Sequence, residues 1–182
     1  MKMGSIAGTV ALVCCGLAGC AAPPTPAAVD AAFLDDAARQ DLLEIRLGEL
    51  AQRYAQLPDV VDYGIRMVAD HDRDLAALRQ LAAAHGTALP SAPDDGQTDF
   101  YLQLSHISGD DFHRQYMDHE LWAKRGEIDM ARREAQAGGD AALMAFARDR
   151  EPQIAGESRL GVDVEVRNHL NVPLTGAGGS TR

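Results

Sequence analysis

Apolar side chains recur every three or four residues over long stretches of this chain, and this spacing constrains the fold more than any other feature. Such a period places the apolar side chains along one face of an α-helix. Runs that alternate apolar and polar residues, as half-buried strands do, are nearly absent, and β-branched residues are sparse. The sequence therefore predicts an all-α fold.

Proline and glycine divide this pattern into four long predicted helices and one short one. We expect the first long helix over residues 29–57, with an apolar face of Leu43, Leu47, Leu50 and Tyr54. The second runs from Pro58 to about residue 85, and its predicted stripe is Val61, Ile65, Val68, Leu75, Leu78 and Leu81 or Ala82. After a loop over residues 86–97, a short helix around residues 100–107 is expected.

A third long helix is expected to follow, capped by Asp110 or Asp111 and ending near residue 137. The last helix spans residues 140–170, and Pro152 should kink it or make it start afresh, because proline lacks the amide donor. Long helices joined by short turns lie antiparallel to their neighbours, so the expected architecture is an antiparallel four-helix bundle with a kinked or broken last helix.

The N-terminus has the layout of an export signal: Lys2 precedes an apolar run over residues 6–18 that ends at Gly19. Leu17-Ala18-Gly19-Cys20 resembles the bacterial lipobox, which implies that residues 1–19 are removed and that Cys20 is lipidated. An ordinary secretory peptide and a buried core helix are the alternatives. Ala21 follows the cysteine, and by resemblance to proteobacterial lipoproteins this favours the outer membrane, facing the periplasm.

The rest of the chain divides by composition. Residues 20–28 are predicted to be the acylated cysteine and a proline-rich tether that holds the domain roughly 25 Å from the bilayer. Residues 29–170 are the bundle domain, and residues 171–182 are predicted to be a flexible tail. Cys14 and Cys15 lie in the signal and Cys20 takes the lipid, so the mature domain has no cysteine left for a disulfide.

Charge narrows the choice of partners. Removal of Lys2 leaves 16 Lys and Arg side chains against 27 Asp and Glu side chains. This acidity argues against nucleic acid and against a basic membrane-binding patch. The expected partners are the membrane, through the N-terminal lipid, and a protein of the cell envelope.

Polar residues on apolar stripes are the candidates for a site, because helical bundles build sites from side chains that face their cores. One such residue occurs on each long predicted helix: Glu44, His71, His119 and Glu157. Together they could bind a transition metal such as Fe, Mn, Zn or Cu. The alternative is that they are hydrogen-bonded core residues, and a haem between His71 and His119 has no supporting motif. Nearby carboxylates could orient the histidines or join them as ligands: Asp70, Asp74, Asp118 and Glu120.

Several short motifs, in order and spacing, resemble the exported ferritin-like family called domain of unknown function 4142 (DUF4142). The motifs are Ala31-Ala32-Phe33-Leu34, Glu44-Ile45-Arg46-Leu47-Gly48, Met67-Val68-Ala69-Asp70-His71, Asp110-Asp111-Phe112, Tyr116-Met117-Asp118-His119-Glu120 and Pro152. The resemblance covers about residues 31–161. It implies a ferritin-like bundle in the periplasm or outer membrane, without a settled activity.

The chain departs from the family pattern at two positions. The family usually has a histidine eight residues after the tyrosine and another five residues after the proline, where this chain has Lys124 and Glu157. His113 also replaces a common aspartate. If the family's histidines bind metal, this chain has lost one ligand and exchanged another for a carboxylate.

Two functions follow from these observations. The favoured one is a membrane-tethered, non-enzymatic envelope protein that serves stress tolerance or protein interaction. The alternative is a metal-binding or redox bundle that uses His71, His119, Glu44 and Glu157. An exposed apolar patch around Trp122 would favour the first function, and a buried polar cluster that joins the four side chains would favour the second.

Overall fold

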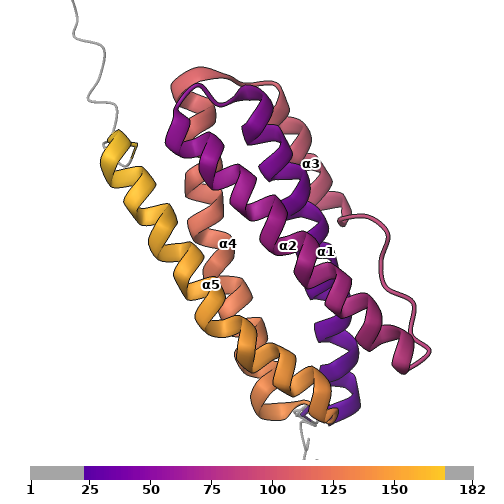
Figure 1. The fold of residues 1–182 in the computed structure, drawn as a ribbon. Helices are drawn as coiled ribbons and strands as arrows, with labels where there is room; N and C mark the ends of the chain where they lie inside the picture. The colour runs from indigo at the N-terminus through magenta and orange to yellow at the C-terminus, as the bar shows by residue number, and fades with distance from the viewer. Residues whose placement is uncertain (1–22, 171–182) are drawn as a thin grey trace, which may run out of the picture.

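The computed structural model describes residues 23–170, and within them the chain is all-α (Figure 1). The long helices are α1 (Pro26–Tyr54), α2 (Pro58–Ala84), α4 (Gly109–Ala137) and α5 (Ala141–Asn168), and the short helix is α3 (Asp95–Ser105). The predicted signal, Cys20 and the predicted tail lie outside the described residues. None of the helices in residues 23–170 is both long and apolar enough to cross a membrane.

The long helices form two antiparallel hairpins, α1–α2 and α4–α5, each closed by a short turn (Figure 1). The segment that contains α3 then runs along the outside of the bundle, from the end of α2 back to the opposite end, where α4 starts. Helix α1 packs on α4, and α2 packs on α5. This single long crossover is typical of ferritin-like bundles, and the predicted antiparallel four-helix architecture is confirmed.

Local chemistry explains where the helices begin. Thr25 accepts a hydrogen bond from the amide of Ala28, and Pro26 occupies the first turn, so α1 starts three residues before the predicted position 29. The carboxylate of Asp140 accepts two amide hydrogen bonds at the start of α5. Asp110 and Asp111 lie in the first turn of α4, and neither caps it as predicted, because Ser108 occupies the capping position.

Helix α5 continues through Pro152 without a break, so the predicted alternative of a fresh start is wrong. The ring of Pro152 is exposed. The residues before and after Pro152 therefore belong to one helix, which spans the length of the bundle (Figure 1).

The buried face of α2 differs from its predicted stripe. Ile65 is 50% exposed, whereas Tyr63, Met67 and His71 are buried. The reason is a close approach of backbones: a Cβ atom on Gly48 of α1 would lie 2.6 Å from the carbonyl oxygen of Gly64. This contact turns the Gly64 face of α2 toward α1, and Ile65, the next residue, turns outward.

Two apolar clusters make up the core, one toward each end of the bundle. The first includes Tyr63, Met67, Phe112 and Tyr116, and the second includes Phe33, Leu34, Leu78, Leu143 and Ile154. On every long helix, charged residues lie in the stretch between the residues of one cluster and those of the other. The centre of the bundle is therefore polar.

A buried charged cluster at the centre of the bundle

Nine buried polar side chains, contributed by all four long helices, meet at the centre of the bundle. We call them the central cluster: Asp41 and Glu44 on α1, His71 and Asp74 on α2, Glu120, Lys124 and Glu127 on α4, and Arg150 and Glu157 on α5. Buried charges are costly unless they are paired and hydrogen-bonded, so the partners of each side chain decide whether this arrangement is stable.

Lys124 lies at the middle of the central cluster and is fully buried. Its Nζ atom donates to Oε1 of Glu127 at 3.0 Å and lies 3.2 Å from Oε2 of Glu157 and 3.8 Å from Oε2 of Glu44. Burial lowers the pKa of Lys124, but the carboxylates of Glu127, Glu44 and Glu157 outweigh burial and hold it well above its usual value. The side chain is therefore a permanent cation.

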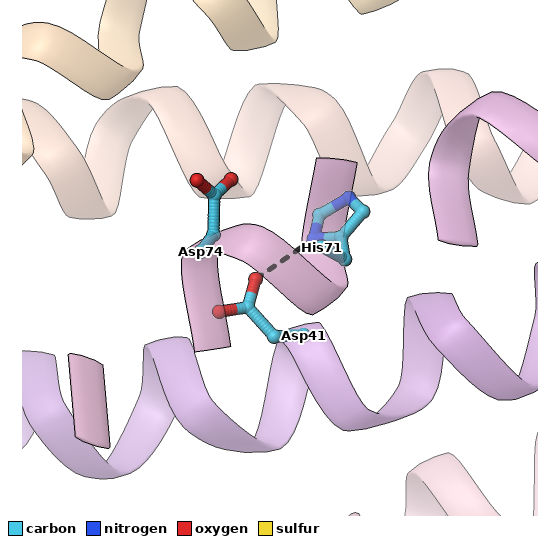
Figure 2. A group of neighbouring side chains, drawn as sticks. All are labelled: Asp41, His71 and Asp74. Atoms are coloured by element: carbon cyan, nitrogen blue, oxygen red, sulfur yellow. Dashed lines mark hydrogen bonds and ion pairs between the residues drawn. The ribbon is translucent and has the colours of Figure 1, made fainter. Parts of the chain in front are cut away.

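His71 connects this lysine to α1. Its Nδ1 atom lies 2.7 Å from Oδ1 of Asp41, a contact drawn as a dashed line in Figure 2, and its Nε2 atom lies 2.8 Å from Nζ of Lys124. An ammonium can only donate, so Nε2 accepts the hydrogen bond from Lys124. Nδ1 therefore carries the proton and donates it to Asp41, which fixes the neutral tautomer of the imidazole.

Arg150 is the second buried cation. Its Nη1 atom lies 3.0 Å from Oδ1 of Asp41 and 3.3 Å from Oδ2 of Asp74, and its Nη2 atom lies 3.4 Å from Oε2 of Glu127. The guanidinium of α5 thus contacts carboxylates from α1, α2 and α4. Figure 2 shows Asp74 beside the Asp41–His71 pair.

Glu44 and Glu120 face each other in the cluster and differ in their protonation. Burial raises the pKa of Glu44, but the ammonium of Lys124 outweighs it and lowers that pKa to about 2. Burial and the neighbouring Glu44 hold the pKa of Glu120 well above its usual value. Of the two carboxyl groups, Glu120 therefore holds its proton to a higher pH than Glu44 does.

The structure brings together three of the four predicted site residues. Glu44, His71 and Glu157 surround Nζ of Lys124. His119 lies apart from them: its ring stacks on Phe100 with the centroids 4.0 Å apart. Among the flanking carboxylates, Asp74 and Glu120 belong to the cluster, whereas Asp70 pairs with arginines near the surface and Asp118 is exposed.

Sequence reasoning missed Asp41, Glu127 and Arg150, and it treated Lys124 only as a lost ligand. Helical spacing was the available signal. Asp41 lies three residues before Glu44, Glu127 lies three residues after Lys124, and Arg150 lies seven residues before Glu157, so each pair shares a helix face.

The donor atoms of the cluster are suited to metals. One ligand atom each from His71, Glu127 and Glu157 lie within 4.8 Å of one another, and the same holds for Asp41, His71 and Asp74. Imidazole and carboxylate donors fit Fe, Mn or Zn. The same atoms, however, contact the charged groups of Lys124 and Arg150.

Comparisons with known proteins agree with this fold. The model of the family described as "Domain of unknown function (DUF4142)" matches residues 16–159. A crystal structure of a DUF305 fragment from Deinococcus radiodurans superposes with a TM-score of 0.69 at 14% identity, over 79% of this chain and 99% of that one. At this identity the likeness concerns the fold alone. A search of curated proteins gave no match.

Proposed function

The chain belongs to the DUF4142 family, and on that premise we propose that it is a non-enzymatic helical bundle of the bacterial cell envelope, held at the membrane by a lipid on Cys20 and stable without metal. The observation that carries this proposal is the ammonium of Lys124, which takes the position a metal ion would take among Glu44, Glu127, Glu157 and His71. A divalent ion among the same atoms would lie beside a fixed positive charge.

The charge of Lys124 makes metal binding unfavourable in two ways. A metal would need the lone pair on Nε2 of His71. That lone pair already accepts the hydrogen bond from Lys124, at 2.8 Å. The oxygens of Glu127 and Glu157 are likewise within 3.2 Å of the ammonium. A metal could bind only after the lysine gave up these partners inside the core, which would leave a buried cation unpaired.

The proposed role in stress tolerance or protein interaction rests on the surface. Trp122 is 70% exposed on α4, although a tryptophan is usually largely buried. An exposed aromatic side chain of this size is typical of contact surfaces.

The proposed tether is shorter than its composition indicates. Five residues separate Cys20 from Pro26, the first residue of α1. At about 3 Å per residue they span roughly 15 Å, so a lipid on Cys20 would hold the start of α1 close to the lipid head groups. The test is metabolic labelling with a palmitate analogue in the host, with Cys20→Ala beside the natural chain. Label on the natural chain alone is expected, and equal labelling of both would contradict the tether.

Metal independence is tested by elemental analysis of the tag-free mature domain, purified without chelator. We expect no near-stoichiometric metal, and a melting temperature that neither chelator nor added Fe²⁺, Mn²⁺ or Zn²⁺ changes. In Lys124→His, which restores the residue that the family pattern has at this position, we expect added metal to raise the melting temperature.

The second candidate is a metal-binding or redox bundle, and the donor atoms of His71, Glu127 and Glu157 within 4.8 Å favour it. Under this alternative the natural domain would contain near-stoichiometric metal, and His71→Ala would lose it. That result would overturn the metal-independent function and turn attention to redox chemistry.

A further inference from the structure

Two adjoining hollows lie beside Trp122, between α1, α3 and α4. The larger, of about 410 Å³, we call the aromatic hollow; its main lining residues are Gln40, Leu43, Gln97, Phe100, His119 and Trp122. The smaller, of about 290 Å³, carries the charged side chains of Arg39, Glu127 and Arg133. Trp122 stands between the two, and its exposed ring forms part of both walls.

Three aromatic rings define one side of the aromatic hollow. The rings of Phe100 and His119 are stacked at an interplanar angle of 20°, and the centroid of Trp122 lies 5.9 Å from that of His119. Burial lowers the pKa of His119, so its imidazole is neutral. Its Nε2 atom is buried and has no hydrogen-bond partner among the described residues. The imidazole therefore adds a flat, neutral ring to the wall of the aromatic hollow.

Two amide side chains form another part of the wall. Nε2 of Gln97 donates to Oε1 of Gln40 at 3.2 Å, and Nε2 of Gln40 donates to Oε1 of Glu44 at 2.7 Å. Oε1 of Gln97 accepts a hydrogen bond from the backbone N–H of Asp94. These bonds hold both amides in fixed orientations, which reduces the entropy that a ligand must overcome in binding them.

The aromatic hollow is almost free of charge. Asp94 is its one charged lining residue. The carboxylate of Asp94 caps α3 by accepting a hydrogen bond from the backbone N–H of Gln97. A charged ligand would therefore lose its hydration without gaining a partner of opposite sign. The volume is in the range of pockets that bind small molecules.

We propose that the aromatic hollow binds a flat, uncharged aromatic compound of one or two fused rings. The ring system stacks against Trp122 and the adjoining Phe100–His119 pair, and polar atoms at its edge hydrogen-bond to the side-chain amides of Gln40 and Gln97. This site is separate from the central cluster, and its occupancy does not depend on whether the cluster binds metal.

Trp122 is the one tryptophan of the chain, so its fluorescence reports on the two hollows that it lines, and variants at Phe100 and His119, which line only the aromatic hollow, separate them. The probe is 1,4-naphthoquinone, which is flat and uncharged and has carbonyl oxygens that accept hydrogen bonds. The matched control probe is cyclohexane-1,4-dione, which has the two carbonyl groups but no aromatic plane. With the mature domain, we expect the quinone to quench Trp122 saturably and calorimetry to give the same dissociation constant. The dione should not bind.

Variants then locate the site. His119→Ala and Phe100→Ala should each weaken quinone binding by about tenfold through lost stacking. His119→Phe keeps a ring and should lose less, and it replaces the alanine variants if they do not fold. Ile65→Ala, which changes a half-exposed side chain on α2, should leave binding unchanged.

Two results would overturn the proposal. Quenching that rises linearly with quinone in the natural domain and in every variant would show collision without binding. Trp122 emission that changes with protein concentration alone, together with dimerisation, would show that a second copy of the chain covers the hollow.

Discussion

Lys124 and the carboxylates around it depend on each other at the scale of single residues. Lys124→Met removes the cation and leaves Glu44, Glu127 and Glu157 buried with like charges facing one another. We expect the free energy of unfolding to fall by about 3–5 kcal/mol, as for other broken buried ion pairs, measured by urea denaturation at pH 7. Arg125→Met, an exposed neighbour, is the control and should change it by less than about 0.5 kcal/mol. A loss below about 1 kcal/mol in Lys124→Met would contradict this interpretation.

Glu134 makes the stability of the domain depend on pH. Burial and the nearby carboxylate of Asp30 raise the pKa of Glu134 to about 7, whereas its ordinary value is 4.5. The folded state therefore holds this proton more tightly than the unfolded state, and stability falls as the pH rises from about 4.5 to about 7.

Glu134→Gln should remove this dependence. Urea denaturation at pH 8 should give a free energy of unfolding higher than that of the natural domain by on the order of 1 kcal/mol, a value reduced for solvent screening. At pH 4.5 the two proteins should differ little. Glu49→Gln, an exposed residue on α1, serves as the control. Equal stability of Glu134→Gln and the natural domain at pH 8 would show that the Glu134 carboxylate is not destabilised.

The sequence predicted that Glu44, His71 and Glu157 face the core, because each lies at helical spacing from apolar residues. It predicted the same for His119, which is partly buried but stacks on Phe100 instead of joining the central cluster. Glu120 points into the central cluster, and adjacent helical residues diverge by about 100°, so His119 points toward α3. Whether His119 or Glu120 faces the centre depends on a rotation of α4 about its axis by one residue. The apolar stripe predicted from sequence is about 100° wide, so it cannot distinguish these two rotations.

At the scale of elements, the contact between α1 and α2 depends on glycine. The same substitution should have opposite effects at two positions. Gly48→Ala places a Cβ atom 2.6 Å from the oxygen of Gly64 and should destabilise the domain by about 2 kcal/mol or more. Gly156→Ala on α5 meets only the side chain of Arg159 at 3.7 Å and should stabilise by about 1 kcal/mol through helix propensity. Thermal denaturation monitored by circular dichroism checks both, and equal signs would contradict the close contact.

Helix ends were more predictable than helix faces. Pro58, Asp140 and the glycines near residue 138 mark ends by local chemistry, and the structure has ends at or beside them. The buried face of α2 instead depends on the Gly48–Gly64 contact, which joins residues distant in sequence. Apolar periodicity alone placed Ile65 inside, because a β-branched residue at that spacing is usually buried.

At the scale of the whole molecule, the central cluster joins the two hairpins. Asp41, Glu44 and Asp74 lie on the α1–α2 hairpin, whereas Lys124 and Arg150 lie on the α4–α5 hairpin. A double-mutant cycle with Asp41→Asn and Arg150→Gln should give a coupling energy of about 2 kcal/mol or more in urea denaturation. The cycle between Asp35 and Arg39, exposed within α1, should give less than about 0.5 kcal/mol. Equal coupling in both cycles would contradict a stabilising role for the buried pair.

The number and length of the helices followed from the sequence, and so did their antiparallel arrangement. The placement of the crossover did not. The prolines and Asp94-Asp95-Gly96 predicted a loop up to residue 97, whereas Asp94 caps α3 and the helix already begins at Asp95. Nothing in these residues gave the direction of the segment's path. That path follows from packing of Phe100 and Leu104 on the core, which only the assembled bundle provides.

The division of charge between the hairpins also favours the correct pairing of the two halves. The inner face of the α1–α2 hairpin carries Asp41, Glu44 and Asp74, whose cationic partners Lys124 and Arg150 lie on α4 and α5. Two α1–α2 hairpins repel each other along that face, whereas the α4–α5 hairpin supplies both cations together with Glu127 and Glu157, which balance their charge. The charges at the centre thus disfavour pairing between two copies of the first hairpin and favour its pairing with the second.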